Sequence, residues 1–457
     1  MSITEARRDG PTQLPWGIDP IPPSERRLGA LDLAVLWGDL GIGLLVLVTG
    51  ALLVPGLGFF PALAVVVVGS IIGVALLAAV GAVGAREGVP TMALFRPVLG
   101  IEGSWVPSAL NLAQLLGWTA VELWAMSFVA DLVVDEVFGF SARWLWLGLA
   151  AVGCTALALW GPVGVTRVWM ERFGAWVIVG ISAIVTVLVL TQDGLMDALT
   201  APGHGVFPTL GPALDLVIAM PISWLPLVAD YNRFATGTRS AARGTFVGYL
   251  IANVWLYSLG ALLVLGAGAE PSPAGIAAGI LAVAGGSLAG ILFLIGLLAG
   301  EADEAFADIY SGAMSLKNIW PKMSEKVLMV GIAIVATALA GWLTMERYES
   351  FLFLIGSVFV PLFGVFIAHH YLGPIGRRSV AFGAWLLGFL LYHWIAPTGP
   401  TGWLALVDSV LGTPLSVRWG WLNASIPSFT LALGLALGGA RLSSAPPSQH
   451  AEPHIER

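Results

Sequence analysis

The chain of 457 residues is 57% hydrophobic and only 11% charged, which excludes an ordinary soluble protein of that length. Its mean hydropathy of +0.87 reflects repeated apolar runs, each long enough to cross about 30 Å of hydrocarbon as a helix, so we expect an all-α integral membrane protein. The net charge of −7, without a basic cluster, gives no reason to expect a nucleic-acid partner, and the single cysteine excludes a disulfide framework.

The first 28 residues are polar and rich in proline, and we expect them to form a disordered cytoplasmic tail. About twelve transmembrane helices are predicted after this tail, from apolar runs between Pro, Gly and charged residues. They lie near residues 31–54, 60–83, 105–130, 143–161, 173–191, 212–230, 244–267, 286–311, 326–344, 350–371, 379–396 and 419–439. We number these predicted helices as spans 1 to 12.

The distribution of basic residues predicts the orientation of the chain. All 21 basic residues except Arg143, Arg347 and Arg418, that is 18, fall on one side of the predicted membrane, which the positive-inside rule identifies as cytoplasmic. We therefore expect a multi-pass protein of the bacterial inner (plasma) membrane with both termini in the cytoplasm. Residues 441–457 are predicted to form a second cytoplasmic tail.

Two predicted spans contain clustered helix-breaking residues. Span 1 carries Gly38, Asp39, Gly41 and Gly43, and span 6 carries Pro221 and Pro226. Unwound backbone at membrane depth is tolerated only beside a cavity, so these breaks predict a binding site. The alternative interpretation is that the glycines only permit close packing of helices.

The interval between the broken spans suggests the organisation of the domain. Spans 1 and 6 are five apart, which suits two inverted repeats of five helices at about 31–191 and 212–371. These repeats form a transporter core of residues 29–371, and two accessory helices follow within residues 379–440.

Span 3 carries four polar or aromatic residues on one helical face. Asn111, Gln114, Trp118 and Glu122 are separated by three, four and four residues, which places all of them on a narrow stripe. A stacking indole one turn from a carboxylate suits a flat heterocycle with N–H donors at its edge. Alternatively, Glu122 pairs with a neighbouring helix and Trp118 is a packing residue.

Span 8 contains four acids within eight residues: Glu301, Asp303, Glu304 and Asp308. Acids at the bilayer centre are costly, at about 2.5–3.5 kcal/mol each on insertion scales, so we expect them to face the protein interior. Glu301, Glu304 and Asp308 share one face by helical spacing, whereas Asp303 points elsewhere. This pattern indicates a path for a cation or proton. The alternative is that the helix ends near Ala299 and the acids lie in a hydrated loop.

Two segments resemble the nucleobase:cation symporter-1 family. Residues 224–234, at the end of span 6, read WLPLVADYNRF and look like the signature of that family at this place. Residues 302–311 in span 8 read ADEAFADIYS and resemble the cytosine and hydroxymethylpyrimidine permeases, especially the hydroxymethylpyrimidine branch linked to the uptake of thiamine precursors. The resemblance covers spans 1 to 10 and implies a leucine-transporter-like fold of five plus five helices, with the substrate held between a bundle and a scaffold of helices.

The resemblance also implies the residues of the substrate site. The tryptophan of the family falls on Trp118 and its polar partner on Glu122, where some relatives carry Gln, and a polar contact in span 8 falls on Asp308. The predicted substrate-binding residues are Trp118, Glu122, Gln114, Asp308, Ser223, Trp224, Gly38 and Asp39.

A coupling site for a cation is implied in the same way. Its predicted residues are Asp303, Ala302, Ala299, Gly41, Ile42 and Glu304. The hydroxyl pair of the family's sodium site falls on Ala302 and Asp303, so one hydroxyl is missing and the other is replaced by a carboxylate. The coupling ion is therefore predicted to be Na⁺ or H⁺.

Together these features predict a symporter that imports a pyrimidine-type nucleobase, such as hydroxymethylpyrimidine or cytosine, by alternating access. We expect no catalytic residues and no cofactor besides the coupling ion, and we expect a monomer whose partners are the nucleobase and the lipid bilayer. Purines and allantoin- or hydantoin-type substrates stay open as alternatives. A channel would show repeated rings of polar residues along a pore, and an intramembrane enzyme would need a His/Asp/Ser or metal-ligand set.

Overall fold

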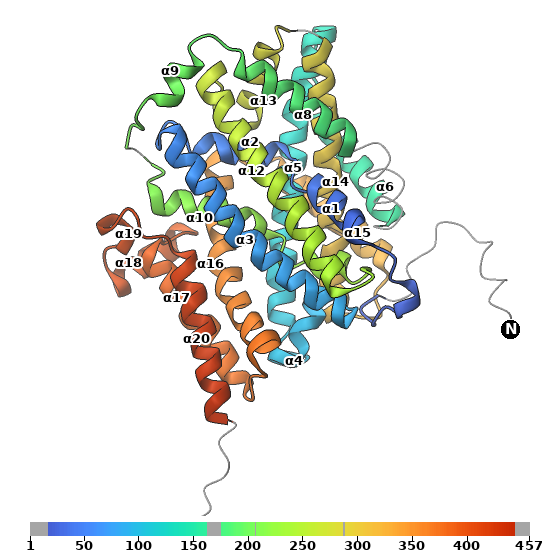
Figure 1. Cartoon of the computed structure of the whole chain (residues 1–457). Coiled ribbons are helices and arrows are strands. Elements are labelled where there is room, and N and C mark those ends of the chain that lie inside the picture. The colour runs from blue at the N-terminus through green and yellow to red at the C-terminus, as the bar shows by residue number, and fades with distance from the viewer. Residues whose placement is uncertain (1–16, 162–174, 206, 287, 444–457) are drawn as a thin grey trace, which may run out of the picture.

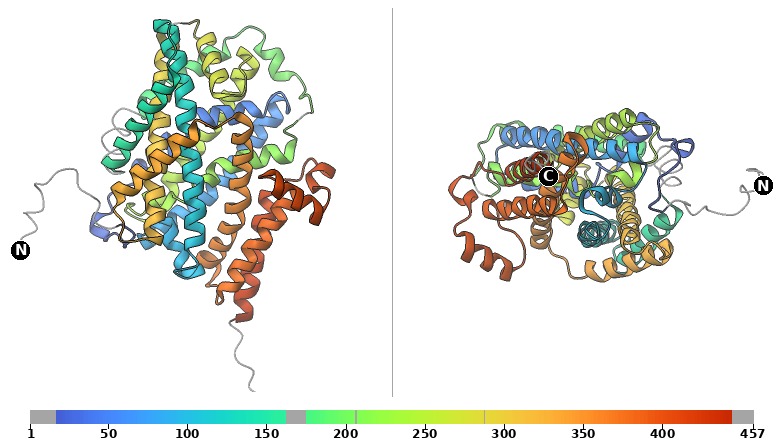
Figure 2. Two further views of the ribbon diagram at one scale, coloured as in Figure 1. Left: turned by 180° about the vertical axis from the view of Figure 1, so that it is seen from behind. Right: turned by 90° about the horizontal axis from the view of Figure 1, so that it is seen from below.

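A computed structural model describes residues 17–161, 175–205, 207–286 and 288–443, and the regular elements in these ranges are helices (Figures 1 and 2). The first half contains η1 (Pro23–Glu25), α1 (Ala30–Asp39), α2 (Leu44–Leu52), α3 (Phe59–Glu87), η2 (Thr91–Phe95), α4 (Arg96–Leu99), α5 (Trp105–Phe138), α6 (Arg143–Trp160), α8 (Ala175–Leu190) and α9 (Leu195–Thr200). The second half contains α10 (Leu210–Ser223), α11 (Val228–Asn232), α12 (Thr238–Ala267), α13 (Pro273–Val283), α14 (Leu288–Ile319), α15 (Glu325–Ala340), α16 (Met345–Ile367), η4 (Ala368–Leu372), α17 (Arg378–Ile395), α18 (Thr401–Leu411), α19 (Leu415–Arg418) and α20 (Ser425–Ser443).

Each predicted span overlaps one of these helices or a helix pair. By length and composition, five helices among the described residues could cross a membrane, and the bent pair α1 and α2 makes a sixth. The long helix α14 carries the four acids that span 8 was expected to place in the interior. The number of twelve spans stays a prediction.

Span 1 is broken where the glycines predict. Helix α1 ends at Asp39 and α2 begins at Leu44, and the two axes differ by 62°. Gly43 adopts an extended conformation directly before α2, and the carboxyl groups of Glu301 and Glu304 fill the space that a side chain would need there. The break therefore lies against the acidic face of α14.

Span 6 is interrupted between α10 and α11, at Trp224–Leu227. Pro221 lies inside α10 rather than at its end, and its ring packs closely on Gly73 of α3. Helices α10 and α11 still continue as one apolar stretch, of which 89% is buried. This span is therefore interrupted in its backbone hydrogen bonds without the sharp bend of span 1.

Helices from both halves of the chain surround the breaks. Helices α5 and α14 pack along one another, and α12 packs on α1, α2 and α3. Helices α16, α17 and α20 pack together, and the C-terminal helices lie on one side of the molecule in both side views (Figures 1 and 2).

Residues 17–28, which the sequence predicts to belong to a disordered tail, instead pack on the ends of two helices. Ile21 N donates to Gly88 O at 2.9 Å, and Arg26 Nη1 donates to Ala85 O at 2.7 Å, both at the end of α3. Leu28 forms a β-bridge with Ala235, just after α11. The side chains of Ile21 and Leu28 are buried, so burial of apolar surface orders this segment.

Candidate functional site

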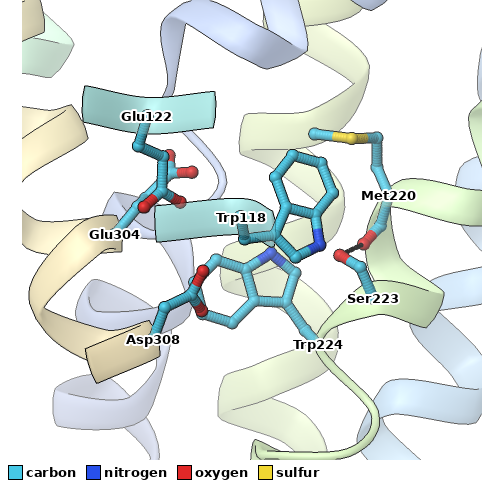
Figure 3. A pocket seen from close by; sticks show the side chains of 7 residues that line it. All are labelled: Trp118, Glu122, Met220, Ser223, Trp224, Glu304 and Asp308. Atoms are coloured by element: carbon cyan, nitrogen blue, oxygen red, sulfur yellow. Dashed lines mark hydrogen bonds between the residues drawn. The ribbon is translucent and has the colours of Figure 1, made fainter. Parts of the chain in front are cut away.

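A small pocket lies where α5, α10 and α14 meet beside the break of span 6 (Figure 3). Its lining consists of Trp118, Glu122, Met220, Ser223, Trp224, Glu304 and Asp308. The free space between them is about 10 Å³, roughly the volume that one water molecule needs. A planar ligand therefore enters only when the lining side chains move apart.

The structure brings together five of the eight predicted substrate-binding residues, namely Trp118, Glu122, Ser223, Trp224 and Asp308. Glu304, which the sequence analysis assigned to the coupling site, also lines this pocket. Met220 was not predicted, because an apolar residue within an apolar span carries no signal of its own. Figure 3 shows the three carboxyl groups on one side of the two indoles, with Met220 and Ser223 on the other.

The two indoles are held by aromatic contacts outside the pocket. Trp118 packs edge-on against Phe351 and Tyr348 of α16, with ring centroids 5.4 and 6.2 Å away. Trp224 packs edge-on against Trp37 of α1 at 5.9 Å. Trp118 Nε1 is buried without a hydrogen-bond partner, so this donor is free for a ligand.

The acids of α14 are buried inside a continuous helix, which excludes the hydrated-loop interpretation. Helix α14 runs through to Ile319, and Glu301, Glu304 and Asp308 are each at most 4% exposed. The carboxyl of Asp308 lies within hydrogen-bonding range of the carboxyl of Glu122 on α5. Two carboxyl groups can share a hydrogen bond only when one of them holds a proton.

Glu301 has a separate role that the sequence analysis did not recognise. Its carboxylate accepts a hydrogen bond from Leu44 N at 2.5 Å and also interacts with the backbone N–H of Leu45. These are the first N–H groups of α2, which have no partner within the helix. A carboxylate from span 8 thus caps the half-helix after the break of span 1, where the positive end of the helix dipole favours it.

Gln114 and Asn111 hold the other break from α5. Gln114 Nε2 donates to Ser223 O at 2.7 Å, at the carbonyl end of α10. Asn111 Nδ2 donates to Ser315 Oγ of α14 at 2.8 Å and, more weakly, to Pro226 O at 3.4 Å. Gln114, predicted to bind substrate, therefore does not line the pocket but holds the backbone of Ser223, which does.

Gly38 and Asp39, also predicted to bind substrate, do not line this pocket. Gly38 packs on the backbone of Gly248 in α12, which agrees with the packing interpretation for this glycine. Asp39 is buried, its two carboxyl oxygens have no hydrogen-bond partner, and the carboxyl group of Asp303 is its acidic neighbour. The structure thus places Asp39 with the predicted coupling residues.

Two of the remaining predicted coupling residues, Gly41 and Ile42, lie at the break of span 1. Ile42 O lies against Gly300 of α14, and Gly41 packs against Ala252 and Tyr249 of α12. Ala299 and Ala302 are only partly buried. Within the described part of the chain, no group of three or more His, Cys, Asp or Glu side chains is arranged to hold a metal ion.

Comparisons with known proteins add the family and the fold. Residues 20–384 match the profile of a family described as permease for cytosine/purines, uracil, thiamine and allantoin. The cytosine permease of Escherichia coli (strain K12) is 26% identical over 409 residues, covering 87% of this chain and 92% of the relative.

Two solved transporters have the same fold. Mhp1, a nucleobase-cation-symport-1 family transporter solved in a closed conformation with bromovinylhydantoin bound, matches with a TM-score of 0.74 and 19% identity, covering 94% of this chain and 96% of Mhp1. A Na⁺-coupled sialic acid symporter matches with a TM-score of 0.63 and 12% identity, covering 92% and 90%. These matches confirm the predicted leucine-transporter-like fold.

Proposed function

Because this chain belongs to the nucleobase:cation symporter-1 family of permeases, we propose that it imports a pyrimidine-type nucleobase bearing an amino group, such as hydroxymethylpyrimidine or cytosine. It is a multi-pass membrane transporter and not an enzyme, as its permease relatives indicate. We further propose that it works as a monomer in the bacterial inner membrane, with both termini in the cytoplasm.

The observation that carries the choice of substrate is the juxtaposition of Trp118 with Glu122 and Asp308 in one buried pocket. The indole offers a flat apolar surface for a ring, and the carboxyl groups accept hydrogen bonds from N–H groups at the ring edge. An aminopyrimidine supplies such donors on one edge. Purines, allantoin and hydantoins are the alternative substrates within the family.

Uptake of labelled compounds by proteoliposomes tests this proposal. Cytosine and hydroxymethylpyrimidine should accumulate against their gradients, and excess unlabelled compound should block the accumulation. A channel would only equilibrate the label across the membrane. Accumulation of adenine or a hydantoin, without either aminopyrimidine, would contradict the proposed substrate.

We place the coupling ion at the break of span 1, beside Asp303. Asp303 is the acidic neighbour of the buried Asp39, whose carboxyl oxygens have no hydrogen-bond partner, and Ile42 O lies against Gly300 of α14. A sodium ion would need several such oxygens, whereas a proton needs one carboxyl group. Both ions therefore use Asp303, but in different ways.

Asp303→Asn separates the two ions. Under proton coupling, uptake by the parent persists without sodium and collapses with a protonophore, and Asp303→Asn abolishes uptake while substrate binding survives. Under sodium coupling, substrate affinity of the parent rises with sodium concentration, and the substitution flattens that dependence because linkage is reciprocal. Normal transport by Asp303→Asn under both gradients would remove Asp303 from the coupling site.

A further inference from the structure

The hydrogen-bonding groups that face the pocket are mostly acceptors. Glu122, Glu304 and Asp308 contribute six carboxyl oxygens, of which Glu122 Oε2 is buried without a partner. Glu304 Oε1 also lacks a partner and lies against Gly43, at the break of span 1. The neighbouring donors are already used, because Ser223 Oγ donates to Met220 O at 2.6 Å and Gln114 Nε2 donates to Ser223 O. The donors that the lining still offers are the indole N–H groups of Trp118 and Trp224, and that of Trp118 is buried without a partner. A ligand that satisfies these carboxyl acceptors must therefore carry several hydrogen-bond donors.

The ionisable groups that line the pocket are also of one kind, since all of them are acids. None of the described residues that line it is Lys, Arg or His. The ionisable groups that act on Glu304 are Glu301, Asp308, Asp39 and Asp303, all of them acids. Buried carboxyl groups at membrane depth need a proton, a cation or a pairing partner.

The buried Arg233 does not supply this counter-charge. Its guanidinium donates to Gly17 O at 2.6 Å and to Tyr310 Oη at 3.0 Å, at the end where residues 17–28 pack. A hydrogen bond between the carboxyl groups of Glu122 and Asp308 needs one proton for the pair, and Glu304 is a third acid beside it.

We propose that the ligand bound in this pocket is a planar cation with an amidinium-type edge. This inference rests on the proposed function, because it specifies the form in which the aminopyrimidine is carried. A ring-protonated aminopyrimidine presents two parallel N–H donors, from the ring nitrogen and the amino group, and this pair fits a carboxylate bidentately. The positive ring lies against Trp118 and Trp224, whose faces attract cations. Rings without an amidine edge, such as uracil or a hydantoin, cannot present this pair of donors and would turn a carbonyl oxygen toward the carboxyl groups, so the pocket disfavours them by repulsion.

Two nearly isosteric probes test the charge directly. Benzamidinium carries a fixed positive charge and an amidinium edge at neutral pH, whereas benzamide has the same ring and is neutral. Binding of each probe to the purified full chain in nanodiscs is measured by isothermal titration calorimetry. We expect benzamidinium to bind at least about tenfold more tightly than benzamide, since charge-assisted hydrogen bonds exceed neutral ones by this order.

Two substitutions test whether the preference for benzamidinium over benzamide arises in this pocket. Glu304→Gln keeps the shape of the side chain and removes an acid, so it should reduce the ratio of the two affinities to within about threefold. The matched control Glu102→Gln removes an exposed acid outside the pocket and should leave the ratio unchanged. Equal binding of the two probes by the parent chain overturns the inference, and this comparison needs no variant. An unchanged ratio in a folded Glu304→Gln protein overturns it as well.

The same experiments distinguish this inference from the proposed function. If neutral nucleobases bind and accumulate while benzamidinium fails to compete, the cationic ligand is wrong and the nucleobase permease stands. If benzamidinium binds with the expected preference while no nucleobase binds or accumulates, the pocket takes planar cations and the proposed substrate is wrong.

Discussion

Removal of the Glu301 carboxylate should destabilise the break of span 1 without touching the pocket. In Glu301→Ala, the N–H groups of Leu44 and Leu45 lose their acceptor at membrane depth. An orphaned buried donor costs about 1–3 kcal/mol, so the two together lower the free energy of unfolding by about 2–6 kcal/mol. Glu301→Gln keeps an acceptor oxygen and loses only the charge at the helix N-terminus, which costs about 0.3–2 kcal/mol.

The free energy of unfolding can be measured for both variants by titration with a denaturing detergent, followed by tryptophan fluorescence. The expected order of stability is parent, then Gln, then Ala, and the Gln variant should retain substrate affinity because Glu301 does not line the pocket. An Ala variant as stable as the parent would show that the N–H groups of α2 find another acceptor, and the capping role would be refuted.

Three further substitutions test the pocket and the break. Glu122→Gln should weaken binding of the transported base about ten- to hundredfold, through loss of a charge-assisted hydrogen bond, and unchanged affinity by calorimetry would contradict its role. Trp118→Ala should cost about 1–3 kcal/mol of binding, and Trp118→Phe should keep part of it; equal binding by both variants and the parent would make the indole a packing residue. Gly43→Ala should reduce uptake and thermal stability because its methyl group collides with two carboxyl groups, whereas Gly148→Ala, which meets nothing within 4 Å, should change neither.

Local patterns in the sequence were sufficient to predict the helices and the composition of two helix faces. The spacing of Trp118 and Glu122 defines one stripe on α5 because helical periodicity depends only on the chain itself. The glycines before Gly43 likewise marked the break of span 1, since they remove side chains where the backbone leaves the helix.

Partners that are distant in the sequence could not be predicted in this way. Periodicity shows which residues share a face of α14. The rotation of that helix against its neighbours decides that Glu304 lies between the pocket and Gly43, and that Glu301 reaches the N–H groups of α2. The docking of residues 17–28 was missed for the same reason, because the Ala85 carbonyl that accepts from Arg26 belongs to the far end of α3. A search for acceptors of the exposed N–H groups at each break would have pointed to Glu301.

Each repeat supplies a side chain that supports the helix break in the other repeat, and this arrangement has a consequence for biosynthesis. Glu301, in the second repeat, caps a half-helix of the first, and Gln114, in the first repeat, holds the break of the second. Leu44 and Glu301 are 257 positions apart, so α2 enters the membrane long before its cap is synthesised. Until then its N–H groups must be hydrated or shielded by the insertion machinery. Halves of the chain expressed separately should therefore be degraded, and halves expressed together should rescue each other.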